Sequence, residues 1–241
     1  MKTLYLHVPK TGGTSITKVL SEHRNNVITE QHPVYKNNPR YHNKYNHVLN
    51  FKFSRAQHFR EVLGDSAYEK LWKVAVVRNP WDRYVSNWKW LTRRESTYPR
   101  KGWKARGWQG EDGDVSFESF VKQMTWCYEE QKSLHGYQHD KWHLRNQIEH
   151  LTDSNGNVII DHVGRFENLQ QEFDLICQKS GLDLRLPHLN RVGHYSGEKE
   201  EHKPTKIHYS TYYTQELIDI VADRCKEDIN AFNYTYEEVL R

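Results

Sequence analysis

A lysine, two glycines and two hydroxyl side chains lie close together near the start of the chain, in an order that suits anion binding. Lys10 supplies a positive charge, while Gly12 and Gly13 let a ligand approach the backbone closely. Thr14 and Ser15 add hydroxyl donors. The order differs from a Walker A loop, in which the lysine follows the glycines. We therefore predict a binding loop for a phosphate or sulfate group.

A second candidate anion site consists of Arg78 and Ser86. Arg78 comes directly after an apolar segment, and Ser86 lies about two helical turns farther along the chain. A guanidinium and a hydroxyl placed in this way can share one phosphate group.

Both motifs are expected at the ends of parallel strands. Residues 3–8 alternate as a strand does, and 72–77 form an apolar run that is typical of a buried parallel strand. A helix is expected after each, with Asn79 as N-cap and Pro80 in the first helical position of the second. Repeated strand–helix units predict an α/β fold, with a P-loop-like central parallel sheet flanked by helices.

Turn and cap signals predict the other elements. The sequence Asp153-Ser154-Asn155-Gly156 between two apolar runs predicts a β-hairpin over 148–163. Helices are expected over 56–63 ending at Gly64, from Leu169 to Gly181, and over 214–232. Residues 24–50, 92–114 and 191–208 are expected to be irregular. The basic, Trp-rich segment 92–114 is interpreted as an acceptor-side insertion, with a solvated flap as the alternative.

Composition narrows the class of protein. The 241 residues favour a single domain over 1–241, and the net charge of +4 suits an anionic ligand but not nucleic acid by itself. Because the strand and its loop begin near Met1 and no long apolar stretch follows, neither a leader nor a membrane anchor is expected. The three cysteines lack metal-ligand spacing, which favours a reduced, cytoplasmic protein without a bound metal.

The two motifs resemble those of sulfotransferases that use 3′-phosphoadenosine 5′-phosphosulfate (PAPS). The first is similar to their 5′-phosphosulfate loop, and Arg78-Asn79-Pro80…Ser86 is similar to their 3′-phosphate segment. Three later segments resemble bacterial and carbohydrate-type members of that family: 163–169, 186–190 and 212–234. The resemblance thus spans residues 3–234.

The resemblance implies PAPS as sulfuryl donor, adenosine 3′,5′-bisphosphate (PAP) as product, and no metal. Lys10 would neutralise the leaving phosphate, and the N–H groups from Thr11 to Ser15 would hold the 5′-phosphate. Arg78 and Ser86 would hold the 3′-phosphate. For Arg165, a cofactor contact and a structural ion pair are equally consistent with the sequence.

The general base is harder to assign. Relatives often have Lys-His-x-x-Ala between the two motifs, and this chain has Phe53 at the histidine position. His47 and His58 are the nearest candidates, with Glu30 and His32 as further possibilities.

The expected acceptor is a hydroxyl (or amine) group of a carbohydrate or another small polar molecule, and the sequence specifies neither it nor the oligomeric state. A nucleotide-binding, kinase-like protein and a non-catalytic polyanion-binding protein are the alternatives.

Overall fold

The computed structural model describes residues 2–29, 32, 55–91, 116–129, 143, 145–186 and 207–237. The chain divides into two compact units, the first formed by Met1–Arg78 with Asn146–Lys206 and the second by Asn79–Arg145 with Ile207–Arg241. That both belong to one domain stays a prediction. In the described ranges, no helix is long and apolar enough to cross a membrane.

The first unit is built on a parallel sheet. Its described strands are β1 (Thr3–Leu6), β2 (Val27–Ile28), β3 (Trp72–Val77) and β4 (His162–Arg165). They lie side by side in the order β2–β1–β3–β4, and all neighbouring pairs are parallel. Every residue of β1 is buried, as are five of the six residues of β3, and the buried positions include the polar residues Thr3 and Lys73.

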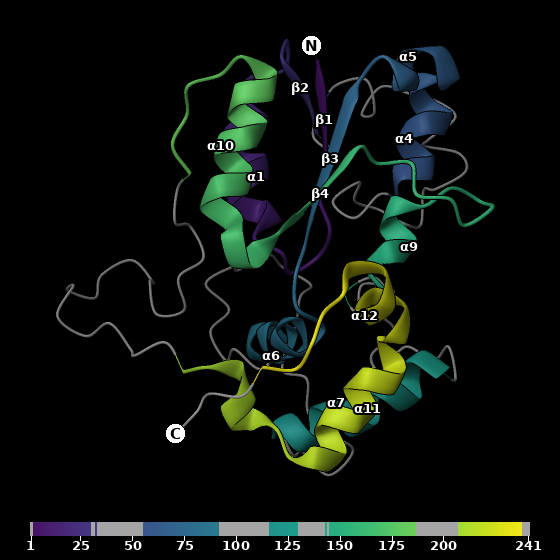
Figure 1. The fold of residues 1–241 in the computed structure, drawn as a ribbon, viewed down its shortest axis with the longest axis vertical. Coiled ribbons are helices and arrows are strands. Elements are labelled where there is room, and N and C mark those ends of the chain that lie inside the picture. Colours follow the sequence, from purple (N-terminus) through teal and green to yellow (C-terminus); the bar gives the residue numbers. More distant parts are fainter. Residues whose placement is uncertain are drawn as a thin grey trace, which may run out of the picture. The chain divides into compact units, whose positions relative to one another are not determined.

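Helices cover both faces of this sheet. The described helices of the unit are α1 (Gly13–Leu20), α4 (Ala56–Leu63), α5 (Asp65–Glu69), α9 (Ile148–Leu151) and α10 (Leu169–Ser180), together with the 3₁₀ turn η2 (Phe166–Asn168). Figure 1 shows α1 and α10 on one side of the strands and α4 with α5 on the other. Ile16 and Leu20 of α1 pack with Phe173 of α10 against Tyr5 and Val76, forming the core of the unit. The predicted α/β fold with a parallel sheet flanked by helices is confirmed.

The predicted hairpin over 148–163 is mostly wrong. Residues 148–151 form helix α9, and a single antiparallel bridge, Thr152 with Val158, remains of the hairpin. The tight turn at Gly156 is present, with a left-handed φ of 83°. Next to the turn the chain does fold back, since the N–H group of Ile159 donates to the carbonyl oxygen of Leu151 at 2.9 Å, but from His162 onward it pairs in parallel with β3.

The second unit is helical in its described part. Its elements are α6 (Pro80–Leu91), α7 (Phe117–Glu129), η4 (Tyr209–Tyr212), α11 (Gln215–Arg224) and α12 (Lys226–Phe232). Aromatic side chains fill its interior: Phe117 makes edge-to-face contacts with Trp88 and Tyr213, and Tyr84 does so with Phe120. Such rings bury large areas, which compensates for the low apolar content of the chain.

The ends of α4, α6 and α10 agree with the cap residues predicted from the sequence, whereas the predicted C-terminal helix is divided. Asn79 Oδ1 accepts the N–H group of Trp81 at 3.1 Å and so caps α6, while Gly64 and Gly181 end α4 and α10. The single helix predicted over 214–232 is instead divided at Cys225, whose backbone leaves the helical region. After this break, Asp228 on α12 lies 3.9 Å from the buried guanidinium of Arg83.

The cysteines behave as expected from their helical patterns. Cys177 in the first unit and Cys225 in the second are free and buried. Burial raises the pKa of both thiols, that of Cys225 to about 12.

Candidate functional site

The anion loop predicted from sequence connects β1 to α1. Lys10 and Gly12 adopt left-handed backbone conformations, with φ of 69° and 79°. Gly12 is the N-cap of α1, and its carbonyl oxygen accepts the N–H group of Ser15 at 3.0 Å. The N–H groups of Gly13 and Thr14 open the helix, where the first turn has no intrahelical acceptors. A negative group at this position therefore meets both N–H donors and the positive end of the helix dipole.

Side chains pack closely behind the two glycines. A Cβ atom on Gly12 would lie 2.8 Å from Cδ2 of Leu169, and one on Gly13 would overlap the imidazole ring of His7. The close approach of a ligand is one reason for both glycines. The structure adds a second reason, which is that a larger residue at either position would have to displace His7 or Leu169.

The hydroxyl groups of the loop differ in their surroundings. Thr11 is fully buried, and its Oγ1 donates to the carbonyl oxygen of Val8 at 2.9 Å. That hydroxyl shapes the loop, so Thr11 offers a ligand only its backbone. Thr14 is exposed, Ser15 is nearly buried, and Lys10 is half-buried.

Arg78 joins the second motif to the first within one unit. It follows the last residue of β3, and its Nη1 atom donates to the carbonyl oxygen of Lys10 at 3.1 Å. Its guanidinium also lies 4.1 Å from the centre of the Phe166 ring, a cation–π contact. The structure thus brings Arg78 and the loop together, as parallel strands ending at one edge predict.

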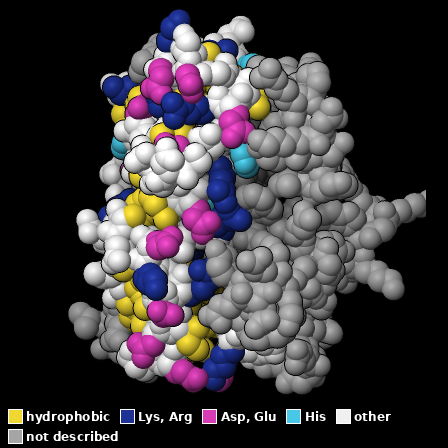
Figure 2. All heavy atoms as spheres, turned by 90° about the vertical axis from the view of Figure 1, so that its right-hand side faces the viewer, with side chains coloured by type: hydrophobic (Ala, Val, Ile, Leu, Met, Phe, Trp, Pro, Cys, Tyr) yellow, Lys and Arg dark blue, Asp and Glu magenta, His cyan; other side chains and the backbone are white. Residues whose placement is uncertain are grey.

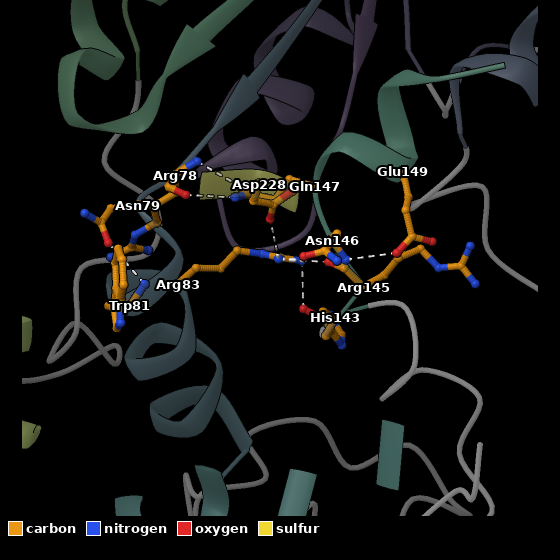
Figure 3. A network of polar contacts seen from close by, with 10 residues as sticks. All are labelled: Arg78, Asn79, Trp81, Arg83, His143, Arg145, Asn146, Gln147, Glu149 and Asp228. Carbon is orange, nitrogen blue, oxygen red and sulfur yellow. Dashed lines mark hydrogen bonds and ion pairs between the residues drawn. The ribbon is translucent and has the colours of Figure 1, made fainter. Parts of the chain in front are cut away.

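Gln147 holds the backbone of Arg78. Its Oε1 accepts the Arg78 N–H group at 2.9 Å, and its Nε2 donates to the Arg78 carbonyl oxygen at 2.8 Å (Figure 3). Gln147 was not predicted from the sequence, because no neighbouring residue marks it as a partner of Arg78, which lies 69 residues earlier in the chain.

Arg165 lies at the same edge of the sheet. It is the last residue of β4 and stands in register with Val77. Glu172 on α10 fixes this strand end, since its carboxylate accepts the N–H group of Arg165 at 3.1 Å and contacts Nε2 of His162 at 2.8 Å. Gly164 makes room for that carboxylate, which a Cβ atom at this position would overlap.

Ser86 belongs to the second unit and is half-buried on α6. The same helix carries Arg83, whose guanidinium is buried and donates to the carbonyl oxygens of His143 and Arg145 at 2.8 and 2.9 Å (Figure 3). Burial lowers the pKa of Arg83, while the charge of Asp228 opposes that effect. Arg83 is therefore a structural group that anchors the helix bearing Ser86.

The base candidates are only partly within the described residues. His47, Glu30 and Phe53 lie outside them, as does the segment 92–114. His58 is described: its Nδ1 accepts the N–H group of Arg55 at 3.3 Å and so caps α4.

His32 is also among the described residues. Its side chain contacts the backbone of Arg24, and its pKa is lowered first by burial and then by the charges of Lys2 and Arg24.

No cluster of three or more His, Cys, Asp or Glu residues suited to a metal ion is present in the part of the chain that the structure describes.

Comparison with known proteins gives one family: the model of the sulfotransferase family matches residues 1–235. No curated protein and no solved structure matches the chain. The match covers nearly the whole sequence, including both anion motifs and the strand that carries Arg165. The chain belongs to the sulfotransferase family.

Proposed function

We propose that this protein transfers a sulfuryl group from PAPS to a hydroxyl (or amine) group of a carbohydrate or another small polar acceptor. The observation that carries the proposal is the contact between Arg78 and the carbonyl group of Lys10. It joins two cationic elements at one sheet edge. A nucleotide with phosphate groups on both its 3′ and 5′ oxygens offers two separate anions to such a pair.

The residues present suit this donor. Gly13 and Thr14 supply N–H groups and Lys10 a charge for the 5′-phosphosulfate, and Ser15 adds a hydroxyl. Arg78 is proposed to hold the 3′-phosphate, since a guanidinium can bind it through two parallel hydrogen bonds. The assignment of Ser86 to the same phosphate, and of Arg165 to the donor, rests on the sequence resemblance.

When bound, PAPS supplies the sulfuryl group, and PAP is the other product. Lys10 is proposed as a catalytic residue because its ammonium group stabilises negative charge on the leaving 5′-phosphate. Backbone N–H donors of the loop act on the same charge without reorganising. Positioning and electrostatics therefore account for the chemistry that this chain contributes, as in phosphoryl transfer.

A base must take the proton of the acceptor hydroxyl, and we propose His47 before His58. Nδ1 of His58 accepts a hydrogen bond from the backbone of Arg55. A neutral imidazole with its Nδ1 lone pair engaged carries its proton on Nε2, so it cannot accept another without breaking the cap. His47 is preferred because it is predicted to lie in a loop, where its imidazole can adapt to an acceptor more readily than a side chain fixed in a helix.

The experiment that tests the proposal compares three ligands by thermal shift: PAP without metal, ATP with magnesium, and heparin. Stabilisation by PAP alone supports a PAPS-dependent enzyme. Stabilisation by ATP with magnesium would favour the kinase-like alternative, and stabilisation by heparin alone the polyanion-binding one. A screen of hydroxylated compounds with labelled PAPS then identifies the acceptor.

The polyanion-binding alternative depends on the basic segment 92–114, which lies outside the described residues. On the face drawn in Figure 2, Lys and Arg side chains are interspersed with Asp and Glu over the described residues. The described side chains drawn there alternate in sign and so by themselves form no continuous positive surface. A cytoplasmic location stays a prediction from the sequence.

A further inference from the structure

Arg78 stands just beyond the point where sheet pairing stops. The last registered pair between β1 and β3 is Leu6 with Ala75, and between β3 and β4 it is Val77 with Arg165. The backbone N–H and C=O groups of Arg78 therefore lie past both ladders of hydrogen bonds. Backbone polar groups inside a protein need partners, and here these must come from outside the sheet.

The side chain of Gln147 supplies both partners, at 2.9 and 2.8 Å, from a fully buried position. A carboxamide carries one acceptor and one donor group in a single plane, so it can pair with a peptide group as a neighbouring strand does. Glutamate lacks the donor and methionine lacks both groups. The pairing is thus specific to an amide side chain of this length.

The other end of Arg78 is held by separate contacts. Its guanidinium donates to Lys10 and lies over the ring of Phe166, whereas Gln147 fixes the main chain from which the side chain extends. The direction of the guanidinium depends on both ends. If the main chain shifts, the side chain cannot keep its contact with Lys10 and also hold the guanidinium in one orientation toward a ligand.

We infer that Gln147 is a positioning residue of the donor site, which holds the backbone of Arg78 so that the guanidinium meets the 3′-phosphate. This inference rests on the proposed function. Gln147 itself contacts no substrate; it acts through Arg78.

The test uses Gln147→Met, which keeps the length of the side chain and removes both hydrogen-bonding groups. Affinities of the full-length protein for PAP and for AMP are measured by calorimetry without metal. We expect PAP binding to weaken about tenfold while AMP binding changes little, because only PAP carries the 3′-phosphate. A purely structural role would lower thermal stability and leave the ratio of the two affinities unchanged.

The matched control is Gln170→Met. Gln170 is an exposed residue of α10 that donates to Asp174, and its replacement should leave the ratio at the wild-type value. In a background of Arg78→Ala, Gln147→Met should have no further effect on the ratio, since the residue through which it acts is gone.

Two outcomes overturn the inference: a wild-type ratio in folded Gln147→Met, or an equal further loss in the Arg78→Ala background. If Gln147→Met does not fold, Gln147→Asn decides, because it keeps the amide but shortens its reach; an unchanged ratio in that variant overturns the inference as well. A wild-type protein that does not prefer PAP to AMP contradicts the proposed function itself, and the two failures are therefore distinguishable.

Discussion

The Nη1 atom of Arg78 donates a hydrogen bond to the carbonyl oxygen of Lys10, 68 residues earlier in the chain. Lys10 is one of two described non-glycine residues with positive φ, the other being Asn233. The residue proposed to act on the leaving phosphate thus adopts an unfavourable backbone conformation, and its main chain is tied to the residue proposed to bind the 3′-phosphate.

The left-handed conformation of Lys10 predicts opposite effects on stability and activity. Lys10→Gly should raise the free energy of unfolding by up to about 1 kcal/mol, because glycine adopts positive φ without steric cost. Turnover should fall on the order of a hundredfold, since the charge is lost. Denaturant titration and single-turnover assays check the two parts.

Two variants serve as controls for this prediction. Lys10→Ala should lose turnover equally but gain no stability, because alanine has a Cβ atom. Asn233→Gly should gain less stability than Lys10→Gly, since asparagine tolerates the left-handed region. Wild-type turnover in either folded Lys10 variant would remove Lys10 from catalysis.

Replacing Arg78 by alanine should abolish the preference for PAP over AMP. Loss of the charge-assisted contact with the 3′-phosphate should weaken PAP binding roughly tenfold to a hundredfold. AMP binding should not change, because AMP has no 3′-phosphate. Calorimetry on both nucleotides measures the effect. Arg185→Ala, a change at an exposed residue of the same unit, should leave both affinities unaltered, and equal affinities in the wild type would refute the role of Arg78.

The contact between His7 and Gly13 predicts a rescue. Gly13→Ala forces its methyl group into the His7 ring and should cost about 1–3 kcal/mol of stability, with loss of PAP binding. In the double variant with His7→Ala the ring is absent, so part of both losses should be recovered.

Gly156→Ala separates this steric effect from backbone strain. Gly156 has positive φ but open space around its Cβ position, so its replacement should lower stability without affecting PAP binding.

The double variant decides whether the two residues are in contact. If the losses of stability in His7→Ala and Gly13→Ala simply add in the double variant, the contact between His7 and Gly13 is refuted.

His32 predicts a pH dependence of stability. Its pKa in the folded protein lies below the ordinary value of 6.5, chiefly through burial. Above 6.5 the imidazole is neutral in both states, and as the pH falls through 6.5 the unfolded chain takes up the proton first, so stability decreases. Denaturant titrations across this range should show a smaller decrease for His32→Gln, and Lys2→Met should reduce it in part. An identical pH profile for wild type and His32→Gln would contradict the prediction.

Local patterns in the sequence predicted the elements whose signals are complete within a short segment. β3 and the start of α6 follow from an apolar run and the pair Asn79-Pro80, and α10 ends at Gly181 as expected. The prediction that residues 24–50 are irregular was wrong at Val27 and Ile28, which form β2, because two residues are too few to show a period. The hairpin prediction failed over 148–151, which form α9, and from His162 onward, where the chain pairs with β3.

The same distinction applies to the site. Lys10 and Arg78 were found because charged residues beside strand ends are visible in the sequence. The sequence did not reveal Gln147, Glu172 or His7, because each acts through a contact that forms only on folding. Gln147 and Glu172 contact the ends of strands, and His7 packs against Gly13. The break at Cys225 was likewise not predicted, because no glycine or proline marks the point at which the backbone leaves the helical region.

The two buried thiols offer a way to time local opening of each unit. Cys177 lies in the first unit and Cys225 in the second, so a thiol reagent can modify either only when its own unit opens. With Cys127 replaced by serine, labelling rates of the two cysteines report two opening equilibria in one sample. If added PAP slows the labelling of Cys177 alone, the nucleotide restrains only the sheet unit. If it slows the labelling of both cysteines, it restrains the helical unit as well.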